Sequence, residues 1–379
     1  MFHVSRNPGE HGTNEVELID AARQAIRSIL PSEWSVTSNQ SSAAAGSHRD
    51  YRPDAELVIT ARDGTTAVVL VECKGVVVPR DVDRISRQLA SYGYTAIVGE
   101  GEAKGAMLVA PFVSPTTRVQ LDRHGLGWFD LTGNLRLRLD RPAVFLDREG
   151  AERSGFRDPA DRLLKSLRGP AAARVVLRLC ETSLPVGVRD LGVQAEVGAA
   201  TSARVLELLD REAVVTRDEN GLVTAVDKRA LVGRWARDYK VMTSNEVVAT
   251  LDPRGLSHAL KALSSVDKRF AVTGSAAARA YLPGDVTPVS PLVSLSVYAE
   301  DPLALMDQLG LRVVERGTNV LVLKAYDDSV YQRSRRIDGI DYAAPAQVVA
   351  DLLTGPGRSS EEAEQLTVVL ESNESGWER

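Results

Sequence analysis

Two apolar runs joined by a short glycine-containing segment constrain the fold of this chain more than any other feature. Residues 55–60 and 67–71 have the composition of β-strands, and Arg62-Asp63-Gly64 lies between them. A three-residue hairpin loop with glycine in the left-handed last position is a common connection between antiparallel strands. Such a loop pairs Ala61 with Thr65 and so fixes the register of both strands.

The predicted register brings charged side chains together at the open end of the hairpin. It sets Asp54 opposite Glu72, and the two-residue alternation of a strand puts Lys74 on the same face. Two carboxylates suit Mg²⁺ or Mn²⁺, and the backbone carbonyl of Cys73 is a further candidate ligand. A lysine beside such a site orients or deprotonates water, which favours a metal-dependent phosphodiesterase. The alternative is an ordinary strand end in solvent, where Glu and Lys are common.

These residues carry a resemblance to a nuclease family. Pro53-Asp54 followed by Glu72-Cys73-Lys74 resembles the core motif of the PD-(D/E)XK superfamily, which implies a restriction-endonuclease-like α/β fold. Gln88 and Tyr92 have the spacing of the Gln-x-x-x-Tyr element in RecB-like members, which implies a supporting catalytic role for Gln88. Many members also place a glutamate of the first helix at the metal, which here implies Glu17. The alternative for Glu17 is a capping box, because Asn14 precedes it by three positions.

Composition limits the other possibilities. The chain has 379 residues, enough for two or three domains, and a net charge of -5, so any nucleic-acid surface must be local. Cys73 and Cys180 are too few for a disulfide framework or a structural zinc site. The sequence contains no signal peptide, membrane-spanning run or Walker-type phosphate loop. We therefore expect a soluble cytoplasmic protein with no nucleotide cofactor and no membrane partner.

Residues 155–240 have the pattern of a winged helix-turn-helix. Helical periodicity covers 171–181, 188–192 and 199–212, and turn residues 218–221 separate two strand-like runs at 213–216 and 222–226. In such modules the recognition helix enters the major groove of double-stranded DNA with its N-terminal part. The candidate DNA-binding residues are Thr201, Ser202 and Arg204 on that helix and Arg217 at the wing. Residues 155–240 contain 15 Lys and Arg against 12 Asp and Glu, a charge of 15 - 12 = +3. Many winged helices bind only proteins, and that alternative stays open.

Residues 241–379 contain a second resemblance. Phe270 to Ser275, followed by a helix-like segment 276–281, resembles the strand-Gly-Ser-helix entrance of nucleotidyltransferase folds. The later strand that carries metal-binding acids in those folds corresponds here to Leu292 to Tyr298, which has serines instead. The resemblance therefore implies a degenerate, binding or scaffold version and not an active transferase. Asp351 is expected to be a turn or helix-capping residue.

Two segments resemble bacterial AbiEi-type abortive-infection antitoxins. The first is Asp130-Leu131-Thr132-Gly133-Asn134, although Gly133-Asn134 is also a good hairpin turn. The second comprises the apolar run 347–353, the glycine-rich segment 355–358 and the helical segment 361–366. The expected fold class is thus multidomain α/β. It consists of a restriction-endonuclease-like domain (1–150), a winged helix-turn-helix (155–240) and an AbiEi-like, nucleotidyltransferase-like α+β domain (241–379).

Two hypotheses about function follow. The first is a metal-dependent DNA endonuclease in defence against phage or other foreign DNA, and the sequence favours it. Its support is the intact set Asp54, Glu72, Lys74 and Gln88, because a domain kept only for binding needs no lysine beside two acids. The second is an antitoxin-like transcriptional repressor that binds DNA and no longer cuts. Under either hypothesis we expect a homodimer, and we expect the C-terminal domain to bind any protein partner.

Overall fold

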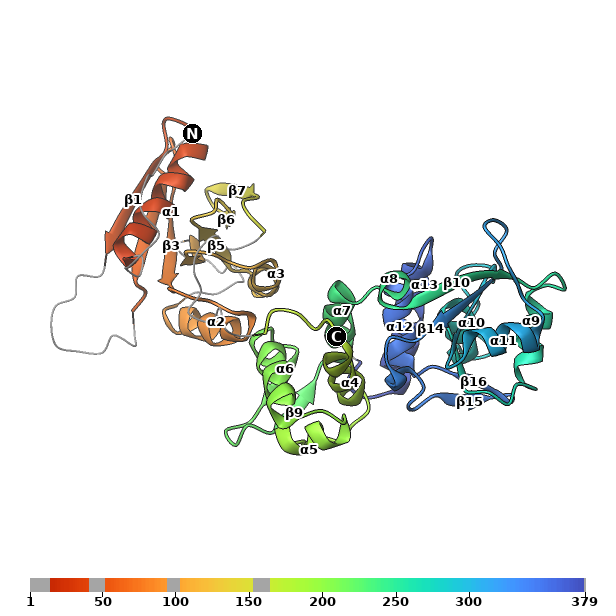
Figure 1. Cartoon of the computed structure of the whole chain (residues 1–379). Helices are drawn as coiled ribbons and strands as arrows, with labels where there is room; N and C mark the ends of the chain where they lie inside the picture. Colours follow the sequence, from red (N-terminus) through yellow and green to blue (C-terminus); the bar gives the residue numbers. More distant parts are fainter. Residues whose placement is uncertain (1–13, 41–51, 94–102, 153–163, 378–379) are drawn as a thin grey trace, which may run out of the picture. The chain divides into compact units, whose positions relative to one another are not determined.

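The computed structural model describes residues 14–40, 52–93, 103–152 and 164–377 (Figure 1). The chain divides into two compact units, Met1–Arg162 and Leu163–Arg379. Within the described ranges, each unit contains helices and one seven-stranded sheet, and the second unit also has a two-stranded hairpin, so the expected mixed α/β class is confirmed. Among the described residues no helix is long and apolar enough to cross a membrane.

The sheet of the first unit has its strands in sequence order, β1 to β7. The central strands β3, β4 and β5 run parallel, and the remaining neighbours are antiparallel. The strands are β1 (Ser35–Gln40), β2 (Ala55–Thr60), β3 (Thr66–Cys73), β4 (Ala103–Ala110), β5 (Gly127–Asp130), β6 (Leu135–Asp140) and β7 (Ala143–Arg148).

The predicted hairpin register is confirmed. The Ala61 amide donates to the Thr65 carbonyl at 2.9 Å, and Gly64 has a φ of +82°, as the three-residue loop requires. The ladder then runs in register to the pair of Ala55 with Val71. Asp54 lies one position beyond this last pair, so its backbone is no longer part of the regular ladder.

Helices cover both faces of this sheet. Helix α1 (Glu15–Ile29) packs its apolar side on the face to which Ala55, Val71 and Cys73 point. Helices α2 (Val82–Ser91) and α3 (Pro115–Arg123) cover the opposite face, where Leu70 is buried; the short 3₁₀ helix η2 (Pro79–Asp81) leads into α2. Because side chains alternate along a strand, Glu72 lies on the α2 face.

Asp130 and Asn134, at the two ends of the β5–β6 turn, build a buried polar network. The β5–β6 hairpin places residues 131–133 in the loop, with Gly133 at a φ of +105°. Asp130 and Asn134 flank the loop and are fully buried. The Asn134 side chain accepts from Arg118 at 2.7 Å and from the Gly150 amide at 2.8 Å, and donates to Asp130 at 2.8 Å. Turn geometry explains the glycine, whereas the buried network explains the two polar side chains.

The second unit begins with three helices and a hairpin. They are α4 (Pro170–Leu179), α5 (Val188–Gln194), α6 (Ala199–Arg211), β8 (Val215–Arg217) and β9 (Val223–Val226), followed by α7 (Lys228–Asp238). The first five lie within about two residues of the segments expected from periodicity, whereas helix α7 was not predicted. Val186 forms an isolated bridge with Val223, which ties the α4–α5 connection to the hairpin.

The rest of the second unit is a sheet with helices. The strand order is β13-β10-β14-β12-β11-β16-β15. The elements are α8 (Val241–Ser244), β10 (Glu246–Leu251), α9 (Leu256–Leu263), β11 (Phe270–Thr273), α10 (Gly274–Tyr281), β12 (Leu295–Ala299), α11 (Pro302–Leu309), β13 (Arg312–Val313), β14 (Val320–Lys324), η3 (Asp328–Val330), β15 (Arg335–Ile337), β16 (Ile340–Tyr342), α12 (Pro345–Leu353) and α13 (Ser359–Asn373). A single apolar core runs from α4 through α13, and the expected boundary at residues 240–241 falls inside it.

Asp351 is the centre of a buried polar cluster, so its prediction as a turn or capping residue was wrong. Its carboxylate accepts hydrogen bonds from Tyr239 (2.7 Å), Thr273 (2.5 Å), Gln347 (2.8 Å) and Tyr298 (2.9 Å). These donors come from the end of α7, from β11, from α12 itself and from β12. The cluster therefore fixes α12 against both the sheet and α7.

Candidate functional sites

Four side chains predicted as catalytic meet at the end of the β2–β3 hairpin. Asp54 Oδ2 accepts from the Cys73 amide at 2.7 Å, which holds the carboxylate over the end of β3. Glu72 Oε1 accepts from Lys74 Nζ and, at 2.9 Å, from Gln88 Nε2. The Lys74 amide donates to the Val109 carbonyl at 2.9 Å, so β4 continues to hold the backbone beyond β3. Two strands and α2 thus position the cluster.

The electrostatics of this cluster depend on Glu72. Its side chain is 2% exposed, and burial raises its pKa; Asp54 raises it further, whereas Lys74 and Gln88 oppose the shift. Its second oxygen, Oε2, is buried and makes no hydrogen bond to a described residue. A buried carboxylate oxygen normally has a partner, so this atom suits a cation or an ordered water.

The donor set can therefore be compared with the Mg²⁺ or Mn²⁺ ion that the nuclease resemblance implies. Asp54, the unpaired oxygen of Glu72 and the Cys73 carbonyl are oxygen donors of the type that these ions prefer, and in this respect the residues fit. Among the described residues, no group of three or more His, Cys, Asp or Glu side chains is placed to hold a metal ion. The metal thus stays a proposal.

The nuclease resemblance also involves Glu17 and Tyr92, and only Tyr92 lies in the cluster. Glu17 is exposed on α1, the helix that packs on the opposite face of the sheet from Gln88 and Glu72, so the structure does not bring it into the cluster. Asn14 does cap α1, with its side chain accepting from the Val16 amide at 3.3 Å. Tyr92, in contrast, joins the cluster, because its hydroxyl accepts from Gln88 Nε2 at 2.7 Å. The Gln-x-x-x-Tyr spacing, one helical turn, was the signal for it.

The N-terminal end of α6 is the second candidate site. Arg204 is exposed and Thr201 is half-buried there, just after the Gly198 cap. Ser202 is fully buried, with its Cβ 3.6 Å from the position that a Cβ on Gly192 would occupy, so it packs against α5. Ser202 therefore supports the angle between α5 and α6 and does not face solvent.

The Arg217 side chain contacts both the wing turn and helix α6. Its Nε donates to the Gly221 carbonyl at 3.1 Å, and its guanidinium lies 3.9 Å from Glu207 of α6. The wing turn itself is held by Asp218, whose side chain accepts from the Asn220 and Leu222 amides. Arg217 thus lies at the predicted wing with its side chain engaged by the turn and by α6.

A groove of about 260 Å³ lies beside the start of α6. Arg204 and Thr201 line it from α6, and Arg168 and Gly169 line it from the segment that precedes α4. Arg168 is exposed and forms no ion pair with a described residue. No sequence pattern pointed to Arg168, because it lies in an aperiodic segment with no motif around it.

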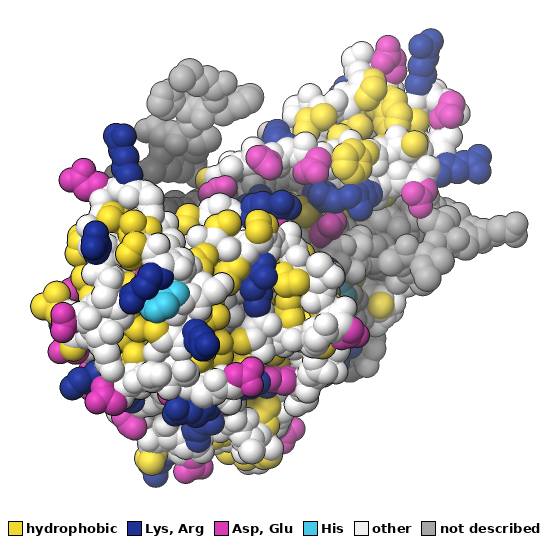
Figure 2. All heavy atoms as spheres, turned by 90° about the vertical axis from the view of Figure 1, so that its right-hand side faces the viewer, with side chains coloured by type: hydrophobic (Ala, Val, Ile, Leu, Met, Phe, Trp, Pro, Cys, Tyr) yellow, Lys and Arg dark blue, Asp and Glu magenta, His cyan; other side chains and the backbone are white. Residues whose placement is uncertain are grey.

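Another face of the second unit has, among its described residues, no local excess of positive side chains like that of the groove beside α6. On the face that carries α9 and α11, Figure 2 shows Lys and Arg side chains spread among Asp and Glu side chains, with apolar side chains between them. This mixed pattern is typical of an ordinary soluble surface. The two arginines that flank the groove beside α6 are therefore the better candidates for binding phosphate.

Comparison with known proteins finds a family match for one region of the chain. Residues 224–370 match the model of a family described as "Transcriptional regulator, AbiEi antitoxin, Type IV TA system". The match begins inside the wing, in β9, and ends within α13, so it includes the Asp351 cluster and most of the second unit. It supports the AbiEi resemblance in this region, and it favours the regulator hypothesis over the nuclease hypothesis. No curated protein and no solved structure matches the chain.

Proposed function

We propose that this protein is an antitoxin-like transcriptional repressor that binds double-stranded DNA through α6 and the wing. One observation carries the proposal: the region that matches a transcriptional-regulator family shares a continuous core with α4, α5 and α6. The regulator-like region and the helices of the expected winged helix therefore form one folded unit, in which α6 presents its N-terminal end to solvent.

The proposed DNA contacts follow from exposure and charge. Arg204 and Thr201 lie where a recognition helix meets base edges, and Arg168 lies across the adjoining groove, where it suits a backbone phosphate. Ser202 has a supporting role, because it is buried against α5. Arg217 orders the wing and remains a candidate for a phosphate contact. A homodimer would present two such helices to a symmetric operator, and the C-terminal sheet is the proposed surface for a protein partner.

A reporter assay tests the regulatory role. The DNA upstream of the coding sequence is fused to a reporter, and the chain is supplied in trans as the natural protein, as Arg204→Ala, or as Arg316→Ala. Arg316 is an exposed arginine in the loop between β13 and β14 and serves as the matched control. We expect repression by the natural protein and by Arg316→Ala, and its loss in Arg204→Ala at equal protein levels. The proposal would be refuted if the reporter output were the same with each of the three proteins as it is without any of them.

We propose a second function for the first unit because four of its predicted catalytic side chains lie at the end of one hairpin. Asp54, Glu72, Lys74 and Gln88 are held by direct contacts, and Glu72 has a buried oxygen without a partner. If Asp54, Glu72 and the Cys73 carbonyl hold Mg²⁺ or Mn²⁺, the ion would stabilise charge on a phosphate oxygen. Lys74 would orient or deprotonate the attacking water, and Gln88 would hold Glu72 in place.

A plasmid assay separates this function from the regulator. Supercoiled DNA is incubated with Mg²⁺ or Mn²⁺ and either the natural protein or Lys74→Ala, with EDTA as a further control. Metal-dependent nicking by the natural protein alone would establish a phosphodiesterase. DNA binding without cleavage by either protein would leave the repressor as the function of the chain.

A further inference from the structure

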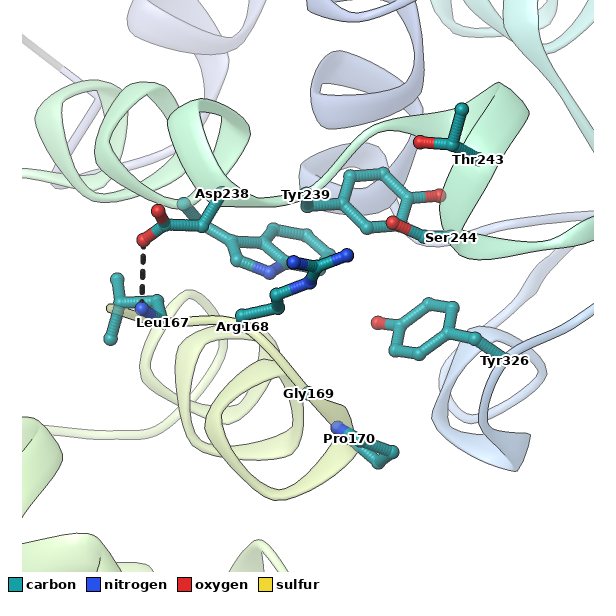
Figure 3. Close-up of a pocket in the computed structure, with 10 residues that line it drawn as sticks. Leu167, Arg168, Gly169, Pro170, Asp238, Tyr239, Thr243, Ser244 and Tyr326 are labelled. Atoms are coloured by element: carbon teal, nitrogen blue, oxygen red, sulfur yellow. Dashed lines mark hydrogen bonds between the residues drawn. The ribbon is translucent and has the colours of Figure 1, made fainter.

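A cavity of about 230 Å³ lies inside the second unit, between the helical part and the C-terminal sheet. Figure 3 shows its lining, which comes from the segment before α4, the end of α7, the short helix α8 and the loop after β14. The lining residues are Leu167, Arg168, Gly169, Pro170, Trp235, Asp238, Tyr239, Thr243, Ser244 and Tyr326. An apolar cavity somewhat smaller than this accepts a benzene molecule, so the volume suits one ring with a small substituent.

Aromatic side chains form much of its wall. Trp235 and Tyr239 stack with their ring centroids 4.7 Å apart, and the Tyr326 ring lies 5.4 Å from that of Tyr239. Trp235 and Tyr239 are almost completely buried, and Tyr239 is also held by the Asp351 cluster. The wall is therefore rigid and favours a flat, apolar ligand body.

The polar groups of the cavity favour an anion. The Tyr326 hydroxyl points into the cavity (Figure 3), and its oxygen is buried without a hydrogen bond to a described residue. Burial raises the pKa of Tyr326, so the hydroxyl remains a donor; the Ser329 hydroxyl is near enough to lower this pKa but does not form a hydrogen bond with it. Arg168 extends toward the same space and forms no ion pair with a described residue.

The carboxylate in the lining does not cancel this preference. Asp238 Oδ2 accepts from Arg234 at 2.7 Å and from the Leu167 amide at 2.8 Å, so this oxygen is already engaged, although Arg234 also pairs with Glu212 at 2.7 Å. Arg168 is the one cationic side chain among the lining residues and forms no ion pair with a described residue, and a buried tyrosine donor faces the same space.

We propose that this cavity is a binding site for a small aromatic carboxylate. The Arg168 guanidinium pairs with the carboxylate, the Tyr326 hydroxyl donates to it, and the ring lies against Tyr239 and Trp235. A hydrogen bond from the Tyr326 hydroxyl to a carboxylate is charge-assisted and stronger than one to a neutral oxygen, which favours the acid over a neutral ligand of the same shape.

The site has a consequence for DNA binding, and this consequence rests on the proposed function. Arg168 lines both the cavity and the groove beside α6. A guanidinium that a bound carboxylate holds inside the cavity is no longer placed for a DNA phosphate in the groove. Ligand binding therefore weakens DNA binding, as an inducer would.

Benzoate is the probe, and benzyl alcohol is its uncharged counterpart. Each is titrated into the full chain and followed by saturation-transfer NMR and calorimetry, with Arg168→Met, Tyr326→Phe and the matched control Arg316→Met. We expect saturable benzoate binding that weakens about tenfold in Arg168→Met and several-fold in Tyr326→Phe, as expected for lost charge-assisted bonds. Arg316→Met should bind as the natural protein does, and benzyl alcohol should bind at least about tenfold more weakly.

Absence of benzoate binding to the natural protein, or equal binding by Arg168→Met, would overturn the site. The effect on DNA is measured separately, as the affinity for the upstream duplex with and without saturating benzoate. A fall in affinity supports the coupling, whereas an unchanged affinity overturns it and leaves the site in place. If the protein binds no DNA, the proposed function fails, while the benzoate titration still decides the site.

Discussion

Asp351→Asn should change the pH dependence of stability in the second unit. The carboxylate is buried within α12, and burial raises its pKa from 3.8 to about 6, although four donors favour the ionised form. A carboxyl group whose pKa is raised by folding stabilises the folded state most at low pH. This contribution is fully present below about pH 4 and is lost as the pH rises through about 6.

The size of the effect follows from the shift. A rise of about two pKa units corresponds to about 3 kcal/mol, and the side chain is fully buried, so solvent screening does not reduce it. Asparagine has nearly the same shape and does not titrate. The free energy of unfolding of the natural protein should therefore fall by about 3 kcal/mol relative to Asp351→Asn between pH 4 and pH 8.

Urea unfolding at a series of pH values measures this difference. Replacing Trp34 and Trp128 with phenylalanine leaves Trp235 and Trp377 to report on the second unit. Asp328→Asn is the matched control, because the Asp328 side chain is 70% exposed and its substitution should leave the pH profile unchanged. A difference that instead favours the natural protein as the pH rises would refute the reasoning. It would show that the four hydrogen bonds outweigh burial and hold the pKa below 3.8.

Two substitutions in the first unit test its packing and its buried network. Gly127→Ala should destabilise the unit by at least about 2 kcal/mol, because a Cβ there would lie 2.6 Å from the Arg136 carbonyl oxygen. Gly75→Ala, where a Cβ meets no atom within 4 Å, should leave thermal unfolding unchanged, and equal melting of the two variants would contradict this. Asn134→Ala should cost about 3 kcal/mol in chemical denaturation, because Arg118 and a backbone amide lose their acceptor. A loss below about 1 kcal/mol would show that water replaces the side chain.

The hairpin and the cluster at its end could be predicted because local rules determine them. A three-residue loop with Gly64 fixes the register, and strand alternation then places Glu72 and Lys74 on one face. The Gln-x-x-x-Tyr motif indicates that Gln88 belongs to the same cluster, and Tyr92 lies one helical turn after it. None of these steps needs knowledge of distant contacts.

Other features depend on contacts that no local pattern encodes. Asp351 lies in an apolar helix, and three of its partners, Tyr239, Thr273 and Tyr298, are distant in sequence. Ser202 is a small polar residue of the type that contacts DNA, but the rotation of α6 about its axis turns this side chain toward α5 and buries it. The position of α1 similarly separates Glu17 from the cluster. Arg168 gains its significance only from the two cavities that it lines.

Fluorescence anisotropy with the purified full chain tests the central claim most directly. A labelled duplex from the region upstream of the coding sequence is compared with a shuffled duplex of the same composition, at several salt concentrations. We expect tighter binding to the upstream duplex, and a loss of about tenfold or more in Arg204→Ala but not in Arg316→Ala. Equal affinity for both duplexes, or equal binding by Arg204→Ala, would contradict sequence-specific binding through α6.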